Sequence, residues 1–507
     1  MLEESFVPNV HRNDLTEDIS SRSLTTYFES FRNHTIGSEC YFESPYGRKQ
    51  VIYADWTASG RLYRPIENHI AEFFGPYMAN THTESTITGT TMTRAYKEAR
   101  NIIKQHVHAN EHDILINTGA GMTSAVNKLQ RILGLRIPEW LNSHYSISEE
   151  NRPVIFMSHM EHHSNQLSWS ETIGDVVCLE PDNQGQVDPE ILEQALIKYR
   201  HRTCKIGSFT ACSNVTGIQT PYHTLARKMH EHGGICFVDF AASAPYVDID
   251  MHPSSPWEQL DGIYFSPHKF LGGPGSSGVL IFNSRLYNNL IPDHPGGGAV
   301  SWTNAWGGRQ YYTDKEARED GGTPPILQTL RTALCLQLKE RMGTTQIIQR
   351  EGELTSILLN ELTQTPGVFV FENQVKERLG IISFIAHRIH YNLFVKLLND
   401  RFGIQARGGC SCAGPYGHYL LQINESTSKA ISDQLDHGNL TNKPGWVRLS
   451  IHPTMTHQEV HTISEAVRSI LTNIEIWKHD YHYDSSTNDW IHKYASHQVS
   501  LDELFNW

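Results

Sequence analysis

The stretch from Tyr264 to Gly278, YFSPHKFLGGPGSSG, places one lysine between a short apolar run and a glycine-rich turn. This lysine, Lys269, lies in a segment that is otherwise almost free of charge. Small flanking residues allow a carbonyl compound to approach its amine closely. Partial burial near other cationic groups lowers the pKa of such an amine, as a Schiff base requires. An ordinary loop lysine would give the same local pattern, so the rest of the sequence has to decide between the two interpretations.

The chain has 507 residues, of which 39% are hydrophobic and 19% charged, which predicts a soluble globular protein of two domains or one large domain with a satellite. Its net charge of -13 and the lack of a long Lys/Arg run argue against nucleic acid or an anionic membrane as the main partner. No apolar stretch approaches the roughly 18–20 residues of a membrane span. The acidic N-terminus does not resemble a secretory signal. We therefore expect a cytoplasmic protein whose 8 cysteines are mostly thiols.

Seven short apolar runs predict the strands of one sheet, because several are apolar on both faces, as a buried and mainly parallel sheet requires. They cover residues 113–117, 153–158, 175–180, 204–211, 235–240, 262–266 and 278–283. Segments with helical spacing, such as residues 189–202, lie between them. This alternation predicts a large α/β domain over residues 51–325, with helices covering a central seven-stranded sheet.

The pattern changes after residue 325, where a long helical stretch over residues 326–362 contains few helix breakers. Together with later apolar runs around a helical segment, this predicts a smaller α+β domain over residues 326–473. We expect residues 1–50 to pack with this smaller domain. The tail from 474 to 507 is rich in His, Trp and Tyr. We expect it to pack on the surface or on a partner subunit, without a part in chemistry.

Polar groups follow several predicted strands, at the edge where open α/β sheets bind their ligands. Gly121, Met122 and Thr123 would begin a helix, whose free N–H groups and positive dipole end suit a phosphate. A plain helix cap would look the same. Asp239 ends a buried strand, where a carboxylate can keep a pyridinium nitrogen protonated.

A pair of adjacent histidines, His162 and His163, follows the strand predicted at 153–158. One imidazole can stack on an aromatic cofactor ring, and a metal pair is the alternative. Because adjacent side chains usually point apart, we favour stacking and predict no metal site.

In this order the pieces resemble the class V aminotransferase superfamily of pyridoxal-phosphate (PLP) enzymes, and within it the cysteine desulfurases and selenocysteine lyases most. The resemblance covers most of residues 50–470. It implies a fold-type I PLP-dependent transferase, with residues 51–325 as the large PLP-binding domain, a small amino-acid substrate and a homodimer. A sulfur-acceptor protein would be a further partner.

The SPHK motif resembles the family's Ser-x-His-Lys, which implies that Lys269 forms the Schiff base with the cofactor. His162, in EHHSN, would stack on the pyridine ring, and Asp239 would pair with the ring nitrogen. Asn214 in CSNVTG matches Ser-Asn-x-x-Gly and would lie near the cofactor oxygen and the substrate carboxylate. The other implied cofactor-binding residues are Met122, Thr123, Ser266 and His268, with Thr323 of GGTPP reaching the phosphate from the second subunit.

A later segment, QARGGCSCAGPYGHYLL, resembles the desulfurase pattern Arg-x-Gly-x-x-Cys-Ala, with Arg407 on the arginine and Cys412 on the nucleophilic cysteine. VRLSIHPTMTHQEV resembles Arg-x-Ser, so Arg448 would clamp the substrate carboxylate, which a bidentate guanidinium suits. Cys412, as a thiolate favoured by Arg407, would attack the substrate sulfur. The alternatives are two loop thiols without a catalytic part, or a metal site from Cys410, Cys412 and His418.

The sequence departs from the family in three places. Ala242 stands where desulfurases carry the glutamine of Asp-x-Ala-Gln. Cys410 adds a second thiol just before Cys412. A polar insertion at 422–445 lengthens the spacing to Arg448, and we expect it to form a loop over the active-site entrance.

Three functions fit these observations. The first is a PLP-dependent cysteine desulfurase that converts L-cysteine to alanine and leaves a persulfide on Cys412. The second is another class V activity, such as a C–S lyase, an epimerase or an aminotransferase, that uses Lys269 without Cys412. The third is a catalytically silent PLP-binding protein, which the intact Lys269, Asp239 and Arg448 argue against.

Overall fold

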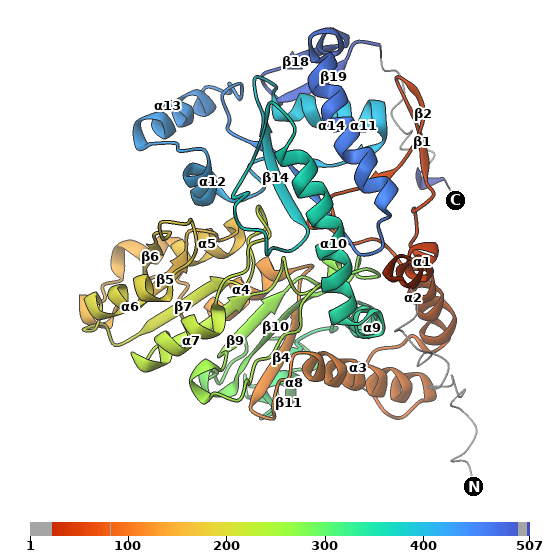
Figure 1. Cartoon of the computed structure of the whole chain (residues 1–507). Helices are drawn as coiled ribbons and strands as arrows, with labels where there is room; N and C mark the ends of the chain where they lie inside the picture. Colours follow the sequence, from red (N-terminus) through yellow and green to blue (C-terminus); the bar gives the residue numbers. More distant parts are fainter. Residues whose placement is uncertain (1–22, 82, 495–503, 507) are drawn as a thin grey trace.

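The chain folds into a larger and a smaller body, and Figure 1 draws the larger body below the smaller one. The computed structural model describes residues 23–81, 83–494 and 504–506. The larger body contains a seven-stranded sheet and the smaller body a four-stranded sheet. The predicted α/β class and the seven-stranded, mainly parallel sheet are confirmed.

The large sheet has the strand order β4-β10-β9-β8-β7-β5-β6. Its strands are β4 (Asp113–Thr118), β5 (Val154–Ser158), β6 (Asp175–Leu179), β7 (Lys205–Thr210), β8 (Ile235–Asp239), β9 (Gly262–Phe265) and β10 (Gly278–Asn283). β10 runs antiparallel to β4 and β9, and the other pairs are parallel. Every residue of β5 and β9 is buried, which is why these strands appear in the sequence as continuous apolar runs.

Helices surround this sheet (Figure 1). They are α3 (Ile87–His106), α4 (Met122–Ile132), α5 (His163–Ser170), α6 (Pro189–Lys198), α7 (Tyr222–Glu231) and α8 (Lys315–Glu319). Helix α2 (Arg64–His69) lies farther from the strands and contacts the helix at Ile326–Met342. A hairpin of β11 (Val300–Thr303) and β12 (Arg309–Tyr311) precedes α8. The carboxyl ends of parallel strands meet at one edge of a sheet. β5, β8 and β9 therefore bring His162, Asp239 and Lys269 to the same edge.

The smaller body is built on the antiparallel sheet β13-β14-β17-β16. Its strands are β13 (Val368–Val370), β14 (Ile381–Ala386), β16 (Arg407–Gly409) and β17 (Trp446–Ser450). Helices α11 (Tyr391–Phe402) and α14 (His457–Trp477) pack with it. A short parallel pair, β3 (Ile52–Tyr53) with β15 (Ile404–Gln405), joins residues near the start of the chain to this body.

The helical stretch predicted over residues 326–362 is two helices, α9 (Ile326–Met342) and α10 (Thr344–Thr363). They are separated at Gly343, whose φ is 72°. Glycine adopts such a positive φ without the steric penalty that a Cβ brings. One glycine in a long helical pattern therefore marks a break here, where the sequence predicted continuity.

The prediction of a loop at 422–445 is wrong. A helix, α13 (Glu425–Asp436), occupies half of this segment and follows another short helix, α12 (Gly414–Leu420). Asn424 caps α13 by accepting the N–H of Thr427. Ile431 and Leu435, one helical turn apart, are partly buried while most of the helix is exposed. Two apolar residues in a polar segment gave too weak a period to predict the helix.

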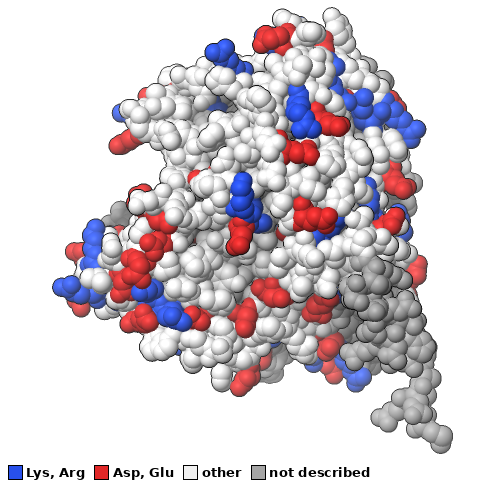
Figure 2. Space-filling model, viewed as in Figure 1, with Lys and Arg blue, Asp and Glu red and all other residues white. Residues whose placement is uncertain are grey.

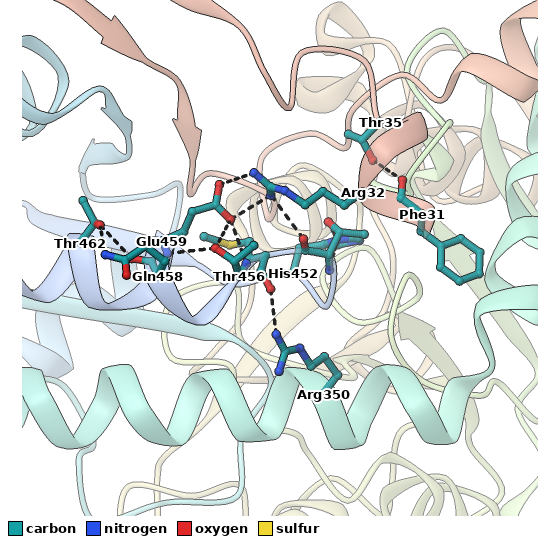
Figure 3. A network of polar contacts seen from close by, with 11 residues as sticks. Phe31, Arg32, Thr35, Arg350, His452, Thr456, Gln458, Glu459 and Thr462 are labelled. Carbon is teal, nitrogen blue, oxygen red and sulfur yellow. Dashed lines mark hydrogen bonds and ion pairs between the residues drawn. The ribbon is translucent and has the colours of Figure 1, made fainter. Parts of the chain in front are cut away.

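Residues 23–50 contact the smaller body. Arg32 in α1 (Leu24–His34) pairs through both of its terminal nitrogens with Glu459 of α14 (Figure 3). Tyr46 connects β1 (Tyr41–Ser44) to β2 (Gly47–Gln50) and donates to Asp480, just before the hairpin of β18 (Tyr481–Asp484) and β19 (Asp489–His492). Expectations for residues 1–22, 495–503 and 507 lie outside the described residues. The domain boundaries stay predictions, and α14 runs through the boundary drawn at residue 473.

In the described parts of the chain, no helix combines the length and apolar character needed to cross a membrane. The face shown in Figure 2 carries Lys and Arg side chains interspersed with Asp and Glu, without one broad region of positive charge. Nucleic-acid-binding surfaces usually show such a region.

Candidate active site

A cavity of about 240 Å³ lies at the carboxyl edge of the large sheet and reaches the smaller body. It brings together residues that are far apart in the sequence. The predicted site residues that line it are Met122, Thr123, His162, Asn214, Asp239, Ser266, His268, Lys269, Arg407, Cys412 and Arg448.

Lys269 is the last residue of a 3-10 turn, Pro267–Lys269, that directly follows β9. Its side chain lines the cavity and is partly buried, and desolvation by the surrounding protein lowers the pKa of the amine to about 8. The Asp239 carboxylate acts in the opposite direction, whereas the positive charges of Arg448 and Arg407 lower the pKa further. The free amine needed for attack on a carbonyl is therefore accessible near neutral pH.

Asp239 ends β8 and is 3% exposed. Burial raises its pKa to about 6, although the N–H of Ala241, 2.8 Å from Oδ1, and the charge of Lys269 favour the carboxylate. A buried carboxylate is stabilised by a cationic partner. A protonated ring nitrogen would be such a partner.

Two histidines in the cavity are held neutral by their surroundings. His162 caps α5, and its Nδ1 accepts the N–H of Ser164 at 3.0 Å. Burial, with the charge of Lys269, lowers the pKa of His162 to about 3 and that of His268 to about 4. A neutral imidazole suits contact with an aromatic ring, and a neutral ring N–H can donate to an anion.

Helix α4 begins at the cavity without a side-chain cap, because its N-cap residue is Gly121. The N–H of Met122 donates to Ser266 Oγ at 2.8 Å, and Thr123 Oγ1 lies 2.7 Å from Ser164 Oγ. A Cβ at Gly121 would lie 3.0 Å from Ser266 Oγ, so glycine opens the space. The helix end and these hydroxyls can receive an anion. A phosphate would share or replace the bond between Met122 and Ser266.

Two arginines from adjacent strands of the small sheet line the opposite side, and Asp55 lies between them. Arg448 of β17 donates from Nη2 to Asp55 Oδ1 at 2.9 Å and from Nη1 to the Asn214 carbonyl at 3.1 Å. Arg407 of β16 donates from Nε to Asp55 Oδ2 at 3.0 Å. Arg448 Nε is buried and has no hydrogen-bond partner in the described structure. The pair is therefore suited to binding a carboxylate.

Cys412 lies in the turn between β16 and α12, and it is exposed. Both Ser411 and Cys412 have left-handed backbone, with φ of 49° and 55°. The larger body contacts this turn directly, because Asn214 Nδ2 donates to the Ser411 carbonyl at 2.7 Å. His163 makes two further contacts with it.

Cys410 is partly buried and packs against the core of the protein, and it does not line the cavity. His418 bonds the Gly414 carbonyl and the Ser428 hydroxyl. Within residues 23–81, 83–494 and 504–506, no three His, Cys, Asp or Glu side chains are grouped to hold a metal ion. A metal site from Cys410, Cys412 and His418 thus has no support in the described structure.

Thr323 is the one predicted cofactor residue that does not line this cavity. It is exposed and lies at a second hollow, beside Gly119 and Pro324. The structure therefore does not bring Thr323 to the site of its own chain.

The cavity residues fit PLP. Asn214 Oδ1 is buried, and no group of the described structure bonds it. Glycine at 121 leaves room for an anion at the start of α4. The amine of Lys269 and the buried carboxylate of Asp239 match the aldehyde and the ring nitrogen of PLP.

Sequence reasoning missed Asp55, Thr57, His163 and Ser164. Asp55 and Thr57 lie in YADWTASG, near the start of the chain, and reach the site only because β3 pairs with β15 and Asp55 pairs with Ser450. No local sequence pattern predicts such a long-range pairing. The EHHSN motif did point to His163, but only His162 received a role.

Comparison with known proteins identifies the family. The aminotransferase class-V family matches residues 52–463. A probable cysteine desulfurase of Streptomyces coelicolor is 25% identical over 404 residues, covering 76% of this chain and 92% of the relative. One of Halalkalibacterium halodurans is 27% identical over 374 residues, covering 73% and 86%. A cysteine desulfurase of Thermococcus onnurineus, solved in the apo form, has a TM-score of 0.70 at 22% identity, covering 88% of this chain and 98% of that one.

The chain therefore belongs to the aminotransferase class-V family. The predicted fold-type I architecture is confirmed, as is the assignment to PLP-dependent enzymes.

Proposed function

We propose that this enzyme is a cysteine desulfurase, which takes sulfur from L-cysteine, holds it as a persulfide on Cys412 and releases alanine. The observation that carries the proposal is the position of Cys412 on the same cavity as Lys269, Asp239 and Arg448. The names of the Streptomyces and Halalkalibacterium relatives support it. A C–S lyase, an epimerase or an aminotransferase would use the lysine and arginine but would not need a thiol at this place.

When bound, PLP supplies an electron sink for the α-carbon of an amino acid. Lys269 Nζ, with a pKa of about 8, can take the α-proton and later return a proton to carbon. Asp239 favours positive charge near its buried carboxylate. His162, held neutral by its bond from Ser164, offers an uncharged ring surface.

Arg448, with Arg407, would bind the substrate carboxylate through paired guanidinium N–H groups. The thiolate of Cys412, and not the thiol, is the nucleophile. As the thiolate attacks the substrate sulfur, an S–S bond forms and the C–S bond breaks. The electron pair of the C–S bond stays with the substrate carbon, which takes up a proton and becomes alanine. The reaction therefore requires no external oxidant or reductant.

The first experiment incubates the PLP-loaded protein with L-cysteine and a thiol reductant, then identifies the carbon product. Alanine with sulfide, lost in Cys412→Ser while the absorption of bound PLP persists, is the expected result. Pyruvate with ammonia would show a C–S lyase instead. Full alanine production by Cys412→Ser would remove Cys412 from the mechanism. A silent PLP-binding protein would show no spectral change with any amino acid.

We also infer a homodimer, in which Thr323 binds the PLP phosphate of the partner subunit. Exposure of Thr323 outside its own cavity supports this arrangement. Light scattering after gel filtration tests the dimer directly.

The 8 free cysteines suit a reducing compartment such as the cytoplasm. Because Cys412 is exposed, a sulfur-acceptor protein could reach a persulfide on it.

A further inference from the structure

His163, the second histidine of EHHSN, has no part in the reaction described above, yet it binds the turn that carries Cys412. It is the first residue of α5, and its N–H donates to the Cys412 carbonyl at 2.7 Å. The N–H of Gly414 donates to His163 Nε2, also at 2.7 Å. One residue therefore contacts the turn at the proposed nucleophile and again two residues later.

The turn has a backbone shape that its own residues disfavour. Ser411 and Cys412 are consecutive, and both have φ in the left-handed region. Residues with a Cβ rarely adopt this region, and such a shape persists only where surrounding contacts impose it. The contacts from His163 and the bond from Asn214 to the Ser411 carbonyl are of this kind.

The fit between His163 and Gly414 is close. A Cβ at Gly414 would lie 2.8 Å from His163 Nε2. Gly414 does not have a positive φ, so the histidine ring, and not the backbone conformation, requires glycine here. Burial lowers the pKa of His163, so the ring is neutral and Nε2 can accept a hydrogen bond.

We propose that His163 is a positioning residue that fixes the Cys412 turn to α5 and so keeps the thiol at the cavity. This inference rests on the proposed function, because it takes Cys412 as the nucleophile. His162 and His163 are consecutive. The same two-residue segment therefore carries the ring predicted to lie on the cofactor and the group that holds the nucleophile.

The test compares His163→Phe, which keeps a ring but removes the acceptor, with His163→Gln, which keeps an acceptor at similar reach. In His163→Phe, kcat for alanine formation should fall about 100-fold, since a displacement of ~1 Å in a reacting group costs that much. The KM for cysteine and the absorption of bound PLP should stay near wild type. His163→Gln should recover most of the lost rate. Gly414→Ala breaks the same bond from its other end and should reproduce the loss.

A second readout is the rate at which iodoacetamide alkylates Cys412, located by peptide mass spectrometry. This rate should rise in His163→Phe and Gly414→Ala, because the released turn no longer holds the thiol at the cavity, where the neighbouring side chains limit the directions from which the reagent can approach. It does not depend on desulfuration, so it tests the turn even if wild type makes no alanine. His437→Phe is the matched control, because His437 is exposed and bonds the Asp433 carbonyl. It should leave both rates unchanged.

Wild-type rates of alanine formation and alkylation in His163→Phe would overturn the proposal. A loss of kcat with unchanged alkylation in both His163→Phe and Gly414→Ala would also overturn it, because the histidine would then act other than by holding the turn. If His163→Phe does not fold, Gly414→Ala decides. A slow Gly414→Ala enzyme with intact PLP absorption and faster alkylation supports the proposal, and a wild-type-like one refutes it.

Discussion

Desolvation lowers the pKa of Lys269 and is the largest of the effects on it, while nearby charged groups shift this pKa in both directions. The resulting pKa of about 8 belongs to the cofactor-free protein. Only the free amine attacks the PLP aldehyde, so the rate of PLP uptake should rise about tenfold per pH unit and level off above about pH 8. An unperturbed lysine would continue to accelerate to about pH 10.

The measurement follows absorption during PLP uptake by the apo-protein at a series of pH values. Borohydride trapping and peptide mapping confirm that the amine that reacts is Lys269, and Lys269→Ala serves as the blank. A rate that is still rising well above pH 8 would show that the amine is not buried as the structure has it.

Asp55 is the counter-charge that a buried guanidinium needs. The side chain of Arg448 is 4% exposed, and burial lowers the pKa of this arginine. Removing one partner of a buried pair leaves an uncompensated charge. Asp55→Ala should therefore lower the free energy of unfolding by about 3 kcal/mol, and Asp55→Asn by less.

Urea unfolding of the apo-protein measures this effect. Asp489→Ala is the control, because its partner Lys396 lies 3.8 Å away and both side chains are well exposed. A surface pair of this kind contributes about 1 kcal/mol or less. Equal losses in the two alanine variants would show that Asp55 is not the required counter-charge.

Residues with a local motif were predictable, and residues placed by tertiary pairing were not. Asp239 is the last residue of a strand, and Lys269 and His162 come shortly after one, and strand ends are visible in a sequence. Asp55 bridges to Ser450, and this pairing brings Asp55 to the cavity's arginines and Thr57 to the cavity wall. No period or spacing in the sequence reveals it.

At the scale of elements, the break between α9 and α10 depends on one glycine. Gly343 has φ of 72°, where an added Cβ would be strained. Gly343→Ala should therefore destabilise the protein by about 1–2 kcal/mol. Gly352, in the middle of α10, has open space around it, and alanine there should stabilise the helix by about 0.5–1 kcal/mol.

These two substitutions are chemically identical and concern the same helix, one at its N-cap and one in its middle, so each controls for the other in urea unfolding. Opposite signs are the expected result. A stabilised Gly343→Ala protein would mean that α9 and α10 can join as the one continuous helix that the sequence suggested.

The strands of the large sheet could be read from the sequence because burial on both faces makes them apolar throughout. Helix α13 could not, because only Ile431 and Leu435 mark its inner side. In an exposed helix with a narrow apolar stripe, the periodic spacing of apolar residues is too short to distinguish a helix from a loop.

At the scale of the whole molecule, the site is shared between the two bodies of one chain, and we propose that it is also shared between two chains. Arg407, Arg448 and Cys412 come from the smaller body, whereas Lys269 and Asp239 come from the larger. Thr323 lies outside this cavity. If it serves the partner subunit, a symmetric dimer contains two sites, each with Lys269 of one chain and Thr323 of the other.

Subunit exchange between Lys269→Ala and Thr323→Ala dimers tests this arrangement. Each mixed dimer would hold one site that lacks both residues and one site with Lys269 and Thr323 intact. Random exchange makes half of the dimers mixed, so activity should recover to about a quarter of wild type. If Thr323 served its own chain, every site in the mixed dimer would lack one residue, and mixing would restore nothing. Because loss of a charge-assisted hydrogen bond costs about 1.5–3 kcal/mol, the assay is run at limiting PLP, where Thr323→Ala alone is poorly loaded.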